Sequence, residues 1–399
     1  MGRIEELLNR AVHLVPPAIR TPVLVRLEPL LAPHAGAILA PATASVTVAG
    51  RLSEPSGLAE GARLMLEALR GAGVAARAAD IGDVPDPALV QAQPGPGTLI
   101  IHVNGPNIPR AMRQLGRAVV RGKRIVGYWA WEVPALPPSW DVAYRFVHDI
   151  WAPSPFAAEA MRRAGGPDVQ VLMHPVAEPA PAALDRASFG LPAGAFVTLC
   201  VFNAGSSIER KNPLGAIRAH RAAFGDDPAR LLVIKTFNTF FEPAPWQAVR
   251  AAAAEAGNVR IIDETMPPDA VTALTAVSDC VISLHRGEGF GLSLAEAMAL
   301  GKPVVATGWS GNMAFMTEAN AALVAFRLVP AVDPQDVFTP AHTVWAEPDV
   351  DAAAAWLRRL AEDGELRARI GAAGREAVRE VLSPARYGRR LVELVGAAS

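Results

Sequence analysis

The sequence predicts an α/β protein built from two doubly wound, Rossmann-like domains. Short runs rich in Val and Ile alternate with longer stretches rich in Ala, Leu and Arg through most of the chain. The short runs are apolar almost without interruption, as expected for parallel strands that helices cover on both faces. A chain of 399 residues is long enough to bury two cores, and the strand–helix alternation occurs twice.

The candidate strands are spread evenly over the two halves of the chain. They are 45–50, 98–103, 124–131, 149–154 and 169–176 in the first half, and 196–203, 231–237, 258–263, 280–285 and 303–308 in the second. Helical patterns connect them, as at 57–73 and 212–225. In the second of these helices Asn212 can cap the start, Pro213 suits the first turn and Gly225 suits the end.

Prolines and alanines cluster at 176–194, between two candidate strands, and mark the best domain boundary. A proline-rich link of this kind is semi-rigid and can act as a hinge. We therefore expect an N-terminal domain over 1–180 and a C-terminal domain over 181–380. A serine–proline pair then has the arrangement of a helix start, which predicts a terminal helix within 381–399 that packs on another part of the chain.

The composition excludes several classes of partner and location. A formal net charge of −1 gives no bulk field for duplex nucleic acid, so we expect no nucleic-acid partner. Two cysteines, Cys200 and Cys280, each lie in an apolar run, which indicates reduced thiols and a cytosolic setting. No window reaches the roughly 18 apolar residues of a membrane span, and the acidic N-terminus does not resemble a signal peptide.

The segment 16–33 leaves one question of location open. It mixes arginines with Val and Leu, so it suits either a membrane surface or packing against the domain. Packing is favoured because it is the commoner fate of such a segment. We expect a cytoplasmic protein, with peripheral contact at the inner membrane as the alternative.

One loop in the second half combines glycines and carboxylates in "HRGEGFGLSLAEAMALGKPVV", residues 285–305. It follows a candidate strand and precedes a helix, the position at which open α/β sheets bind ligands. Gly287, Gly289 and Gly291 allow the backbone to approach a ligand closely. The helix that follows aims its free N–H groups at the loop, so the sequence predicts an anion site here.

Two glutamates accompany this anion site. A carboxylate would compete with a bound phosphate, so Glu288 suits a polyhydroxylated group beside the phosphates, while Glu296 suits a ribose diol. The structural alternative is equally supported by the residues alone: Ser293 to Glu296 fits a capping box, and Glu288 can simply lie near a positive helix end.

A second candidate anion site is "FNAGSSIERKNP", residues 202–213. Ser206 lies in its loop, and Arg210 and Lys211 stand at a predicted helix start, where cations oppose the helix dipole. This placement favours a phosphate clamp over a solvated basic turn. Lys235, inside an apolar strand, is either a second phosphate contact or a lysine that snorkels to the surface.

The motifs give no metal site. There is no HExxH, no paired CxxC, no GxGxxG after a strand and no GxxxxGK[ST]. The acidic triplet Asp349 to Asp351 precedes an alanine-rich stretch and is interpreted as the start of a helix.

The first half offers a candidate acceptor pocket in "GYWAWEVPALPPSW". Trp129, Trp131 and Glu132 end a predicted strand there, and sugar rings stack their apolar C–H faces on aromatic rings. Ordinary core tryptophans fit the pattern equally well. Gly57, which joins a strand to a helix, can also face a cleft between the two predicted domains.

Several of these motifs together resemble the retaining glycosyltransferases of family 4 (group 1), which have the GT-B fold. "EGFGLSLAE" is similar to the E-x7-E motif of that family, and "RKNP", "GKPVVATGWSGNMAFM" and "VWAEPDVDAAA" follow the family's order around it. "VGYWAWEVPALPPSW" and "IWAPSPFAAEAM" resemble its first domain.

The resemblance implies a metal-independent transferase that uses a nucleoside-diphosphate sugar, bound by the second domain in an interdomain cleft. Glu296 would hold the ribose and Glu288 the transferred sugar. The diphosphate would contact Lys211 and the backbone at Gly289, Phe290, Gly291 and Leu292. The terminal helix would cross back to the first domain. No cofactor beyond the donor is implied; GDP-mannose is one donor of the family, and the acceptor would be a glycan or a lipid-linked sugar, as in polysaccharide biosynthesis.

One departure concerns the phosphate clamp. The family commonly has an arginine shortly before the clamp lysine, where this chain has Ser206, and Arg210 is the candidate replacement. Two other functions therefore stay open. An epimerase or phosphorylase of the same architecture would differ in its need for an acceptor, and a non-catalytic nucleotide-sugar-binding protein is favoured by the Ser206 departure alone.

Overall fold

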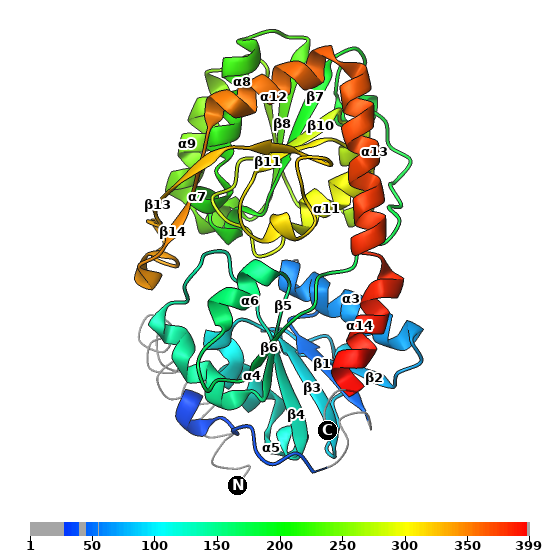
Figure 1. Cartoon of the computed structure of the whole chain (residues 1–399), viewed down its shortest axis with the longest axis vertical. Coiled ribbons are helices and arrows are strands. Elements are labelled where there is room, and N and C mark those ends of the chain that lie inside the picture. Colours follow the sequence, from blue (N-terminus) through cyan, green and yellow to red (C-terminus); the bar gives the residue numbers. More distant parts are fainter. Residues whose placement is uncertain (1–27, 40–44, 55, 397–399) are drawn as a thin grey trace.

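The computed structural model describes residues 28–39, 45–54 and 56–396. Each half of the chain forms a six-stranded parallel sheet between helices, one above the other in Figure 1, and the second half adds an antiparallel hairpin. The two doubly wound α/β domains predicted from the alternation of strands and helices are thereby confirmed.

The first sheet has the spatial order β2-β1-β3-β4-β5-β6. Its strands are β1 (Val46–Gly50), β2 (Ala76–Asp80), β3 (Gly97–His102), β4 (Lys123–Tyr128), β5 (Asp149–Ala152) and β6 (Asp168–Val171), and its helices are α3 (Gly57–Gly71), α4 (Ile108–Leu115), α5 (Arg117–Val120) and α6 (Pro155–Met161). The strand order reverses between β1 and β3, which is where such sheets open a crevice. Strand β2, "ARAAD", was not predicted because it lacks a continuous apolar run.

The second sheet has the spatial order β12-β11-β10-β7-β8-β9. Its strands are β7 (Phe196–Val201), β8 (Arg230–Thr236), β9 (Val259–Asp263), β10 (Cys280–Ser283), β11 (Val304–Thr307) and β12 (Ala322–Val324), and its helices are α7 (Ile208–Lys211), α8 (Pro213–Phe224), α9 (Pro243–Ala254), α10 (Pro268–Val277), α11 (Leu292–Ala299), α12 (Val350–Glu362) and α13 (Gly364–Val381). Parallel strands end at one edge of the sheet, so the loops after β7, β8 and β10 meet there.

Helix starts follow the predicted chemistry in two places. The Asn212 carboxamide accepts the Gly215 N–H at 3.0 Å and so caps α8. Asp349 accepts the N–H groups of Asp351 and Ala352, both at 2.9 Å, which confirms that the acidic triplet begins a helix.

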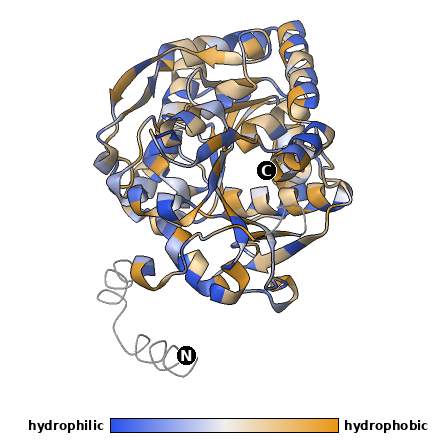
Figure 2. Ribbon diagram, turned by 60° about the horizontal axis from the view of Figure 1, so that its bottom comes forward, coloured by the Kyte–Doolittle hydropathy of each residue, from blue (hydrophilic) through white to orange (hydrophobic). Residues whose placement is uncertain are grey.

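Alternate residues of the strands pack into different cores, as the pleat of a sheet requires. In β3, for example, Leu99 and Ile101 belong to one buried cluster and Ile100 to another. The helices that cover the sheets carry both hydrophilic and hydrophobic residues (Figure 2). Cys200 and Cys280 are free and buried, as predicted, and burial raises the pKa of both thiols to about 12.

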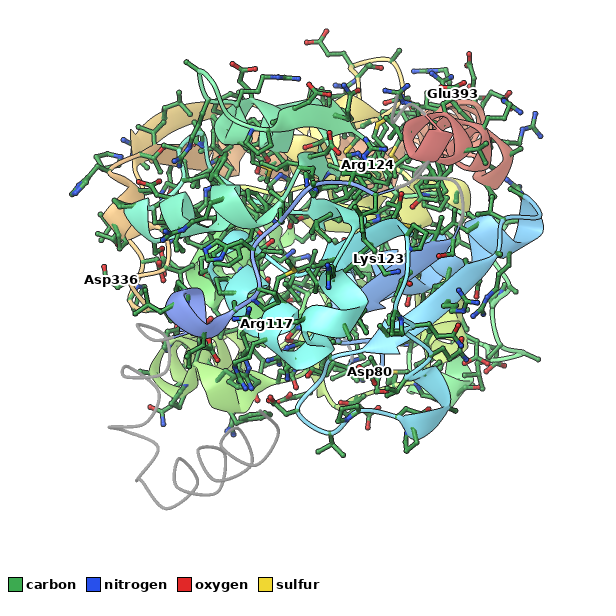
Figure 3. The ribbon with its side chains drawn as sticks, turned by 90° about the horizontal axis from the view of Figure 1, so that it is seen from below. Asp80, Arg117, Lys123, Arg124, Asp336 and Glu393 are labelled. Atoms are coloured by element: carbon green, nitrogen blue, oxygen red, sulfur yellow. The ribbon has the colours of Figure 1, made fainter. Side chains whose placement is uncertain are left out.

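The terminal helix α14 (Pro384–Gly396) packs against α3, beside the first sheet (Figure 1). Arg124 of β4 donates through Nη1 to the Leu394 carbonyl at 2.7 Å, and Figure 3 shows Arg124 near this helix. The Val176 N–H donates to the Leu382 carbonyl at 2.8 Å, so the two chain segments that connect the halves lie side by side. The domain limits at residues 180 and 380 stay predictions.

The hairpin of β13 (Phe326–Pro330) and β14 (Val344–Pro348) was not predicted. Its connecting loop, which includes the 3₁₀ helix η9 (Thr339–Ala341), reaches the other domain, because the Phe338 ring lies 5.1 Å from that of Trp131. Further 3₁₀ turns are η2 (Pro87–Leu89), η3 (Gly105–Asn107), η4 (Pro138–Phe146), η5 (Ala187–Phe189), η6 (Ala204–Ser206), η7 (Thr239–Phe241) and η8 (Gly311–Ala314).

Within the described residues, no helix has both the length and the apolar character required to cross a bilayer. Most of the segment 16–33, for which a membrane surface was one alternative, lies outside the described residues.

Candidate active site

A charged cluster lies at the carboxyl edge of the second sheet and joins two loops that are far apart in the chain. Lys211, at the end of α7, donates through Nζ to Glu288 Oε1 at 2.5 Å. Arg210 Nη1 lies 3.6 Å from the same oxygen. Burial disfavours the Glu288 carboxylate, but Lys211 and then Arg210 outweigh that effect and lower its pKa to about 2.

Both terminal nitrogens of the Arg210 guanidinium donate to protein groups, whereas its Nε is buried without a partner. Its side chain is 2% exposed; Nη1 donates to the Gly287 carbonyl and Nη2 to both the carbonyl and Oγ of Ser206, each at 2.7 Å. The group therefore lies beside the position at which the family has its arginine, but it fixes two loops and has few donors left for a ligand.

Glu132 adds a fourth charge to this cluster, and it comes from the first domain. Its Oε1 lies 3.7 Å from Arg210 Nη2, and burial raises its pKa. The cluster thus consists of two cations from the second domain and one carboxylate from each domain, so it links the two halves of the molecule.

The helix-dipole argument for Arg210 and Lys211 is wrong. Both residues form the last turn of α7, whereas the next helix starts at Pro213. Cations at the end of a helix are favourable, so the dipole does not indicate a missing anion. Instead, Ser207 holds the turn at a φ of 66° and accepts the Arg210 N–H at 3.2 Å, a strained arrangement of the kind found at ligand sites.

The backbone between Glu288 and α11 offers unpaired donors. The N–H groups of Gly289, Phe290, Gly291 and Leu292 donate to no other group in the described part of the chain. They precede or begin α11, so its dipole adds to their positive potential. These unpaired amides lie where the strand–glycine–helix pattern predicted an anion site, and anion binding there stays a prediction.

The capping-box alternative for Glu296 is wrong. Helix α11 starts after Gly291, whose φ is 94°, and it has no side-chain cap. Glu296 is exposed, and its carboxylate has no hydrogen-bond partner among the described residues. The surrounding protein disfavours its charge, and Glu60 of α3 repels it, so its pKa rises to about 7. Gly57, the first residue of α3, stands one turn before Glu60.

Two of the loop glycines also lie against the first domain, a close approach that the sequence did not indicate. A Cβ on Gly287 would lie 2.2 Å from the Glu132 carbonyl oxygen, and one on Gly289 would lie 3.3 Å from that of Trp131. Ser154 reinforces the contact, because its Oγ donates to the Gly289 carbonyl at 2.6 Å.

Trp129 and Trp131 do not line an acceptor pocket. They are 0% and 4% exposed and belong to the core of the first domain. Trp131 donates through Nε1 to the Ala135 carbonyl at 2.8 Å and packs edge-on against Trp140. Neither ring presents a face for stacking, so we replace the expected sugar contact with a structural role in shaping the loop that carries Glu132.

Lys235 is not a snorkelling surface lysine, because it is 2% exposed. Its Nζ donates to the carbonyls of Glu264 and Thr236 at 2.5 and 3.0 Å, and burial lowers its pKa. Two of its three donors are therefore occupied, and a phosphate contact through the third stays a prediction.

Three contributors to the site were missed from the sequence. Ser310 has a φ of 81° and accepts the Glu288 N–H through Oγ at 2.9 Å. Ser154 binds the loop across the domain boundary, and Glu60 opposes Glu296. A serine–proline helix start marks Ser154, whereas no local pattern distinguishes Ser310 or Glu60.

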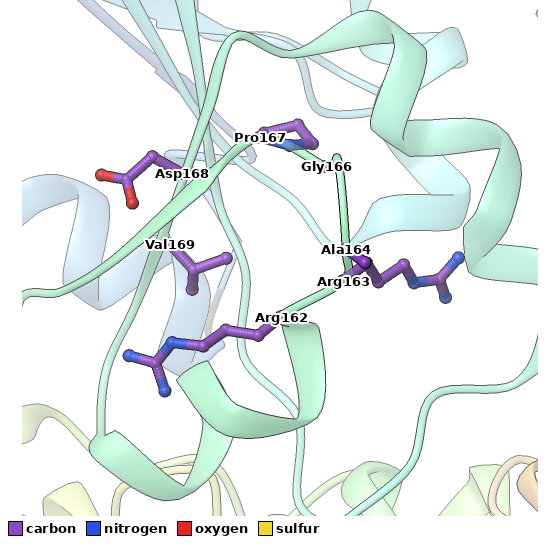
Figure 4. A pocket seen from close by; sticks show the side chains of 7 residues that line it. All are labelled: Arg162, Arg163, Ala164, Gly166, Pro167, Asp168 and Val169. Atoms are coloured by element: carbon purple, nitrogen blue, oxygen red, sulfur yellow. The ribbon is translucent and has the colours of Figure 1, made fainter.

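No group of three or more His, Cys, Asp or Glu side chains in the described ranges is placed to hold a metal ion. A separate pocket of about 470 Å³ lies at the turn between α6 and β6 (Figure 4). Its two arginines, Arg162 and Arg163, already pair with Glu159 and Asp141, each at 2.6 Å, so this pocket offers no unpaired cation.

Comparisons with known proteins agree with this architecture. Residues 247–377, which include both glutamates of the motif but not Lys211, match the family model "Glycosyl transferases group 1". Among curated proteins, a sequence search finds no match. The family match and the fold indicate a glycosyltransferase.

Several solved structures share the fold. HepE of Anabaena, in complex with UDP and glucose, superposes with a TM-score of 0.64 at 15% identity and covers 88% of this chain and 99% of its own. A glycosyltransferase of Rickettsia africae gives 0.64 at 14% identity, over 89% and 99%. The TarM G117R mutant of S. aureus gives a TM-score of 0.54 at 12% identity. That match covers 76% of this chain and 55% of the TarM chain. The predicted GT-B fold is thereby confirmed.

Proposed function

We propose that the chain transfers a sugar from a nucleoside-diphosphate sugar to a glycan or lipid-linked acceptor, with retention at the anomeric carbon as in family 4. The observation that carries this proposal is the Lys211–Glu288 pair beside the unpaired amides of residues 289–292. A cation and aligned amides can hold a diphosphate, and the adjacent carboxylate can bind sugar hydroxyl groups.

The donor would lie along the loop before α11. Its diphosphate would contact the amides and Lys211, its ribose would donate to the unpaired Glu296 carboxylate, and its sugar would donate to Glu288. Because the pKa of Glu288 is about 2, this carboxylate is ionised at neutral pH and acts only as an acceptor. It orients the sugar and does not serve as a general acid.

The chemical step breaks the bond from the anomeric carbon to the phosphate oxygen and forms a bond to the acceptor oxygen on the same face. The leaving nucleoside diphosphate takes the acceptor proton, so the atoms balance without a protein base or a metal ion. Negative charge grows on the leaving phosphate, where Lys211 and the amides are already aligned to stabilise it.

The donor base and sugar are the finer part of the proposal. HepE and TarM carry UDP in their crystals, and GDP-mannose is the donor suggested by family resemblance. The buried free thiols of Cys200 and Cys280 fit a reducing compartment, so we place the reaction in the cytoplasm.

A thermal-shift panel tests the donor site. At a hundred times its dissociation constant, a ligand adds about 2.7 kcal/mol of stability. We expect UDP or GDP, and one of their sugars, to raise the melting temperature, whereas adenosine diphosphate serves as the matched control. Proton NMR of the transferred sugar then reports retention. Failure of every nucleoside diphosphate to stabilise the chain would overturn the proposal.

A further inference from the structure

Two phenylalanines are exposed at the carboxyl edge of the second sheet. Phe240 is 71% exposed and Phe241 is 60% exposed, and their ring centroids lie 4.2 Å apart at an angle of 35°. They belong to η7, directly after β8. An exposed pair of this kind forgoes the stabilisation of burying two large rings, so it indicates a contact outside the folded chain.

The turn that carries these rings is firmly held. Asn238, with a φ of 61°, donates through Nδ2 to Asn203 Oδ1 at 3.2 Å. The Thr239 hydroxyl donates to Asp263 Oδ2 at 2.9 Å. Glu242, directly after the pair, accepts the Ile208 N–H at 3.0 Å. The rings are therefore presented in a defined position, as at binding sites built on rigid elements.

The pair also lies beside the proposed phosphate site. A Cβ on Gly205 would lie 3.0 Å from Phe241 Cδ2, so this ring packs against the loop that contains Ser206. Ser206 in turn contacts Arg210. Glu242 caps the start of α7, the helix that ends in Arg210 and Lys211.

We infer that Phe240 and Phe241 form a saccharide subsite for the acceptor glycan; this inference rests on the proposed function. The apolar C–H face of a pyranose ring would lie on the aromatic pair, and its hydroxyl groups would donate to the exposed carboxylates of Asp263 and Glu264 and to the Asn238 carboxamide.

The flanking charges select this occupant over a membrane. The carboxylates of Asp263 and Glu264 would be repelled by an anionic lipid surface, whereas they accept hydroxyl donors from an uncharged sugar. The subsite would hold sugar units at a distance from the reacting hydroxyl group, since the transferred sugar is assigned to Glu288.

The test uses the full chain and an array of immobilised neutral gluco- and manno-oligosaccharides of graded length. We expect the double variant Phe240→Ala/Phe241→Ala to bind its best oligosaccharide about tenfold more weakly, because both stacking contacts are lost. Phe240→Trp/Phe241→Trp should retain binding. Val392→Ala on α14, which removes an exposed apolar side chain elsewhere, is the matched control.

Nucleotide binding and vesicle binding are two further measurements that decide between occupants. Unchanged oligosaccharide binding by the double alanine variant, or no oligosaccharide binding by the unsubstituted chain, would overturn the inference. A loss of UDP or GDP binding alone would assign the rings to the nucleobase, and a loss of binding to phosphatidylcholine–phosphatidylglycerol vesicles alone would assign them to a membrane; both results overturn it. Nucleotide binding by the unsubstituted chain reports separately on the proposed function.

Discussion

Glu288 and Glu296 belong to one motif, yet the surrounding protein shifts the pKa values of the two carboxylates in opposite directions. Glu288 is 8% exposed, but Lys211 and Arg210 hold its pKa at about 2. Glu296 is exposed, but the protein around it and the facing Glu60 raise its pKa to about 7.

The surrounding protein disfavours the charge of both carboxylates, and only Glu288 has cations close enough to reverse that effect. The charges around Glu288 are balanced without a ligand, since each of them has a partner of opposite sign. In the Glu296 region Glu60 pairs with Arg63 at 2.6 Å, but the Glu296 carboxylate accepts no hydrogen bond from the described residues. A ligand that supplies hydroxyl groups would therefore give it donors. A donor ribose has that chemistry, and the following predictions test the contrast.

Lys211→Ala should have the largest effect. It removes the partner of Glu288 and the cation assigned to the leaving phosphate, so turnover should fall roughly 10²–10³-fold, the cost of losing one preorganised group. Steady-state transfer assays with saturating donor measure this fall. Arg218→Ala, which removes an exposed cation from α8 in the same domain, should stay close to the unsubstituted rate. Equal rates for both variants would remove Lys211 from the mechanism.

Glu288→Gln should change how stability depends on pH. The folded-state pKa of Glu288 is lowered from 4.5 to about 2, so its contribution is complete above pH 4.5 and is lost as the pH falls towards 2. The full shift corresponds to about 3 kcal/mol, an upper value for a side chain that is 11% exposed. Urea denaturation at pH 2.5 and pH 6 should show a smaller difference for the variant. A difference as large as that of the unsubstituted chain would contradict the ion pair.

Glu60→Gln should shift the pH dependence of donor binding. Glu296 accepts ribose hydroxyl groups best when ionised, so the affinity for the nucleoside diphosphate should rise between pH 6 and pH 8. Removing the facing acid lowers the pKa of Glu296, and the rise should therefore occur at lower pH. The raised pKa also means that Glu296 favours folding less as the pH rises from 4.5 to 7, an effect that its exposure to water weakens.

Isothermal titration at half-unit steps of pH would measure this shift. Glu67→Gln, on the same helix α3, is the matched control because it removes an acid that is not coupled to Glu296. If donor affinity depends on pH in the same way in Glu60→Gln as in the unsubstituted chain, the two acids do not interact.

The sequence predicted the parts of this site that are local in the chain. A strand, a glycine-rich loop and a helix were enough to predict the unpaired amides of 289–292, and Asn212 to Gly225 gave a helix with both ends correct. Contacts between residues far apart in the chain could not be predicted, because nothing local indicates that Lys211 meets Glu288 or that Glu60 faces Glu296. The identity of a tryptophan likewise does not tell whether its ring is covered, so Trp131 was misassigned.

The smallest expected effect concerns the contact that joins the two regions to the first domain. Ser154 Oγ donates to the Gly289 carbonyl at 2.6 Å and also accepts the Ala157 N–H at 3.1 Å as the cap of α6. Ser154→Ala loses both bonds and should cost about 2 kcal/mol of stability, since a cap and a buried hydrogen bond are each worth about 1 kcal/mol.

Ser56→Ala separates the two losses. Ser56 caps α3 through the Ala59 N–H at 3.2 Å and makes no bond to the second domain, so its variant should lose only about 1 kcal/mol. Hydrogen exchange then reports the interdomain part. The amides of Glu288 and Gly311, which donate to Ser310 Oγ and to the Glu288 carbonyl, should exchange faster in Ser154→Ala and unchanged in Ser56→Ala. Similar exchange in both variants would mean that Ser154 acts only as a helix cap, and that the contacts of Arg210, Lys211 and Ser310 are enough to hold the glycine loop.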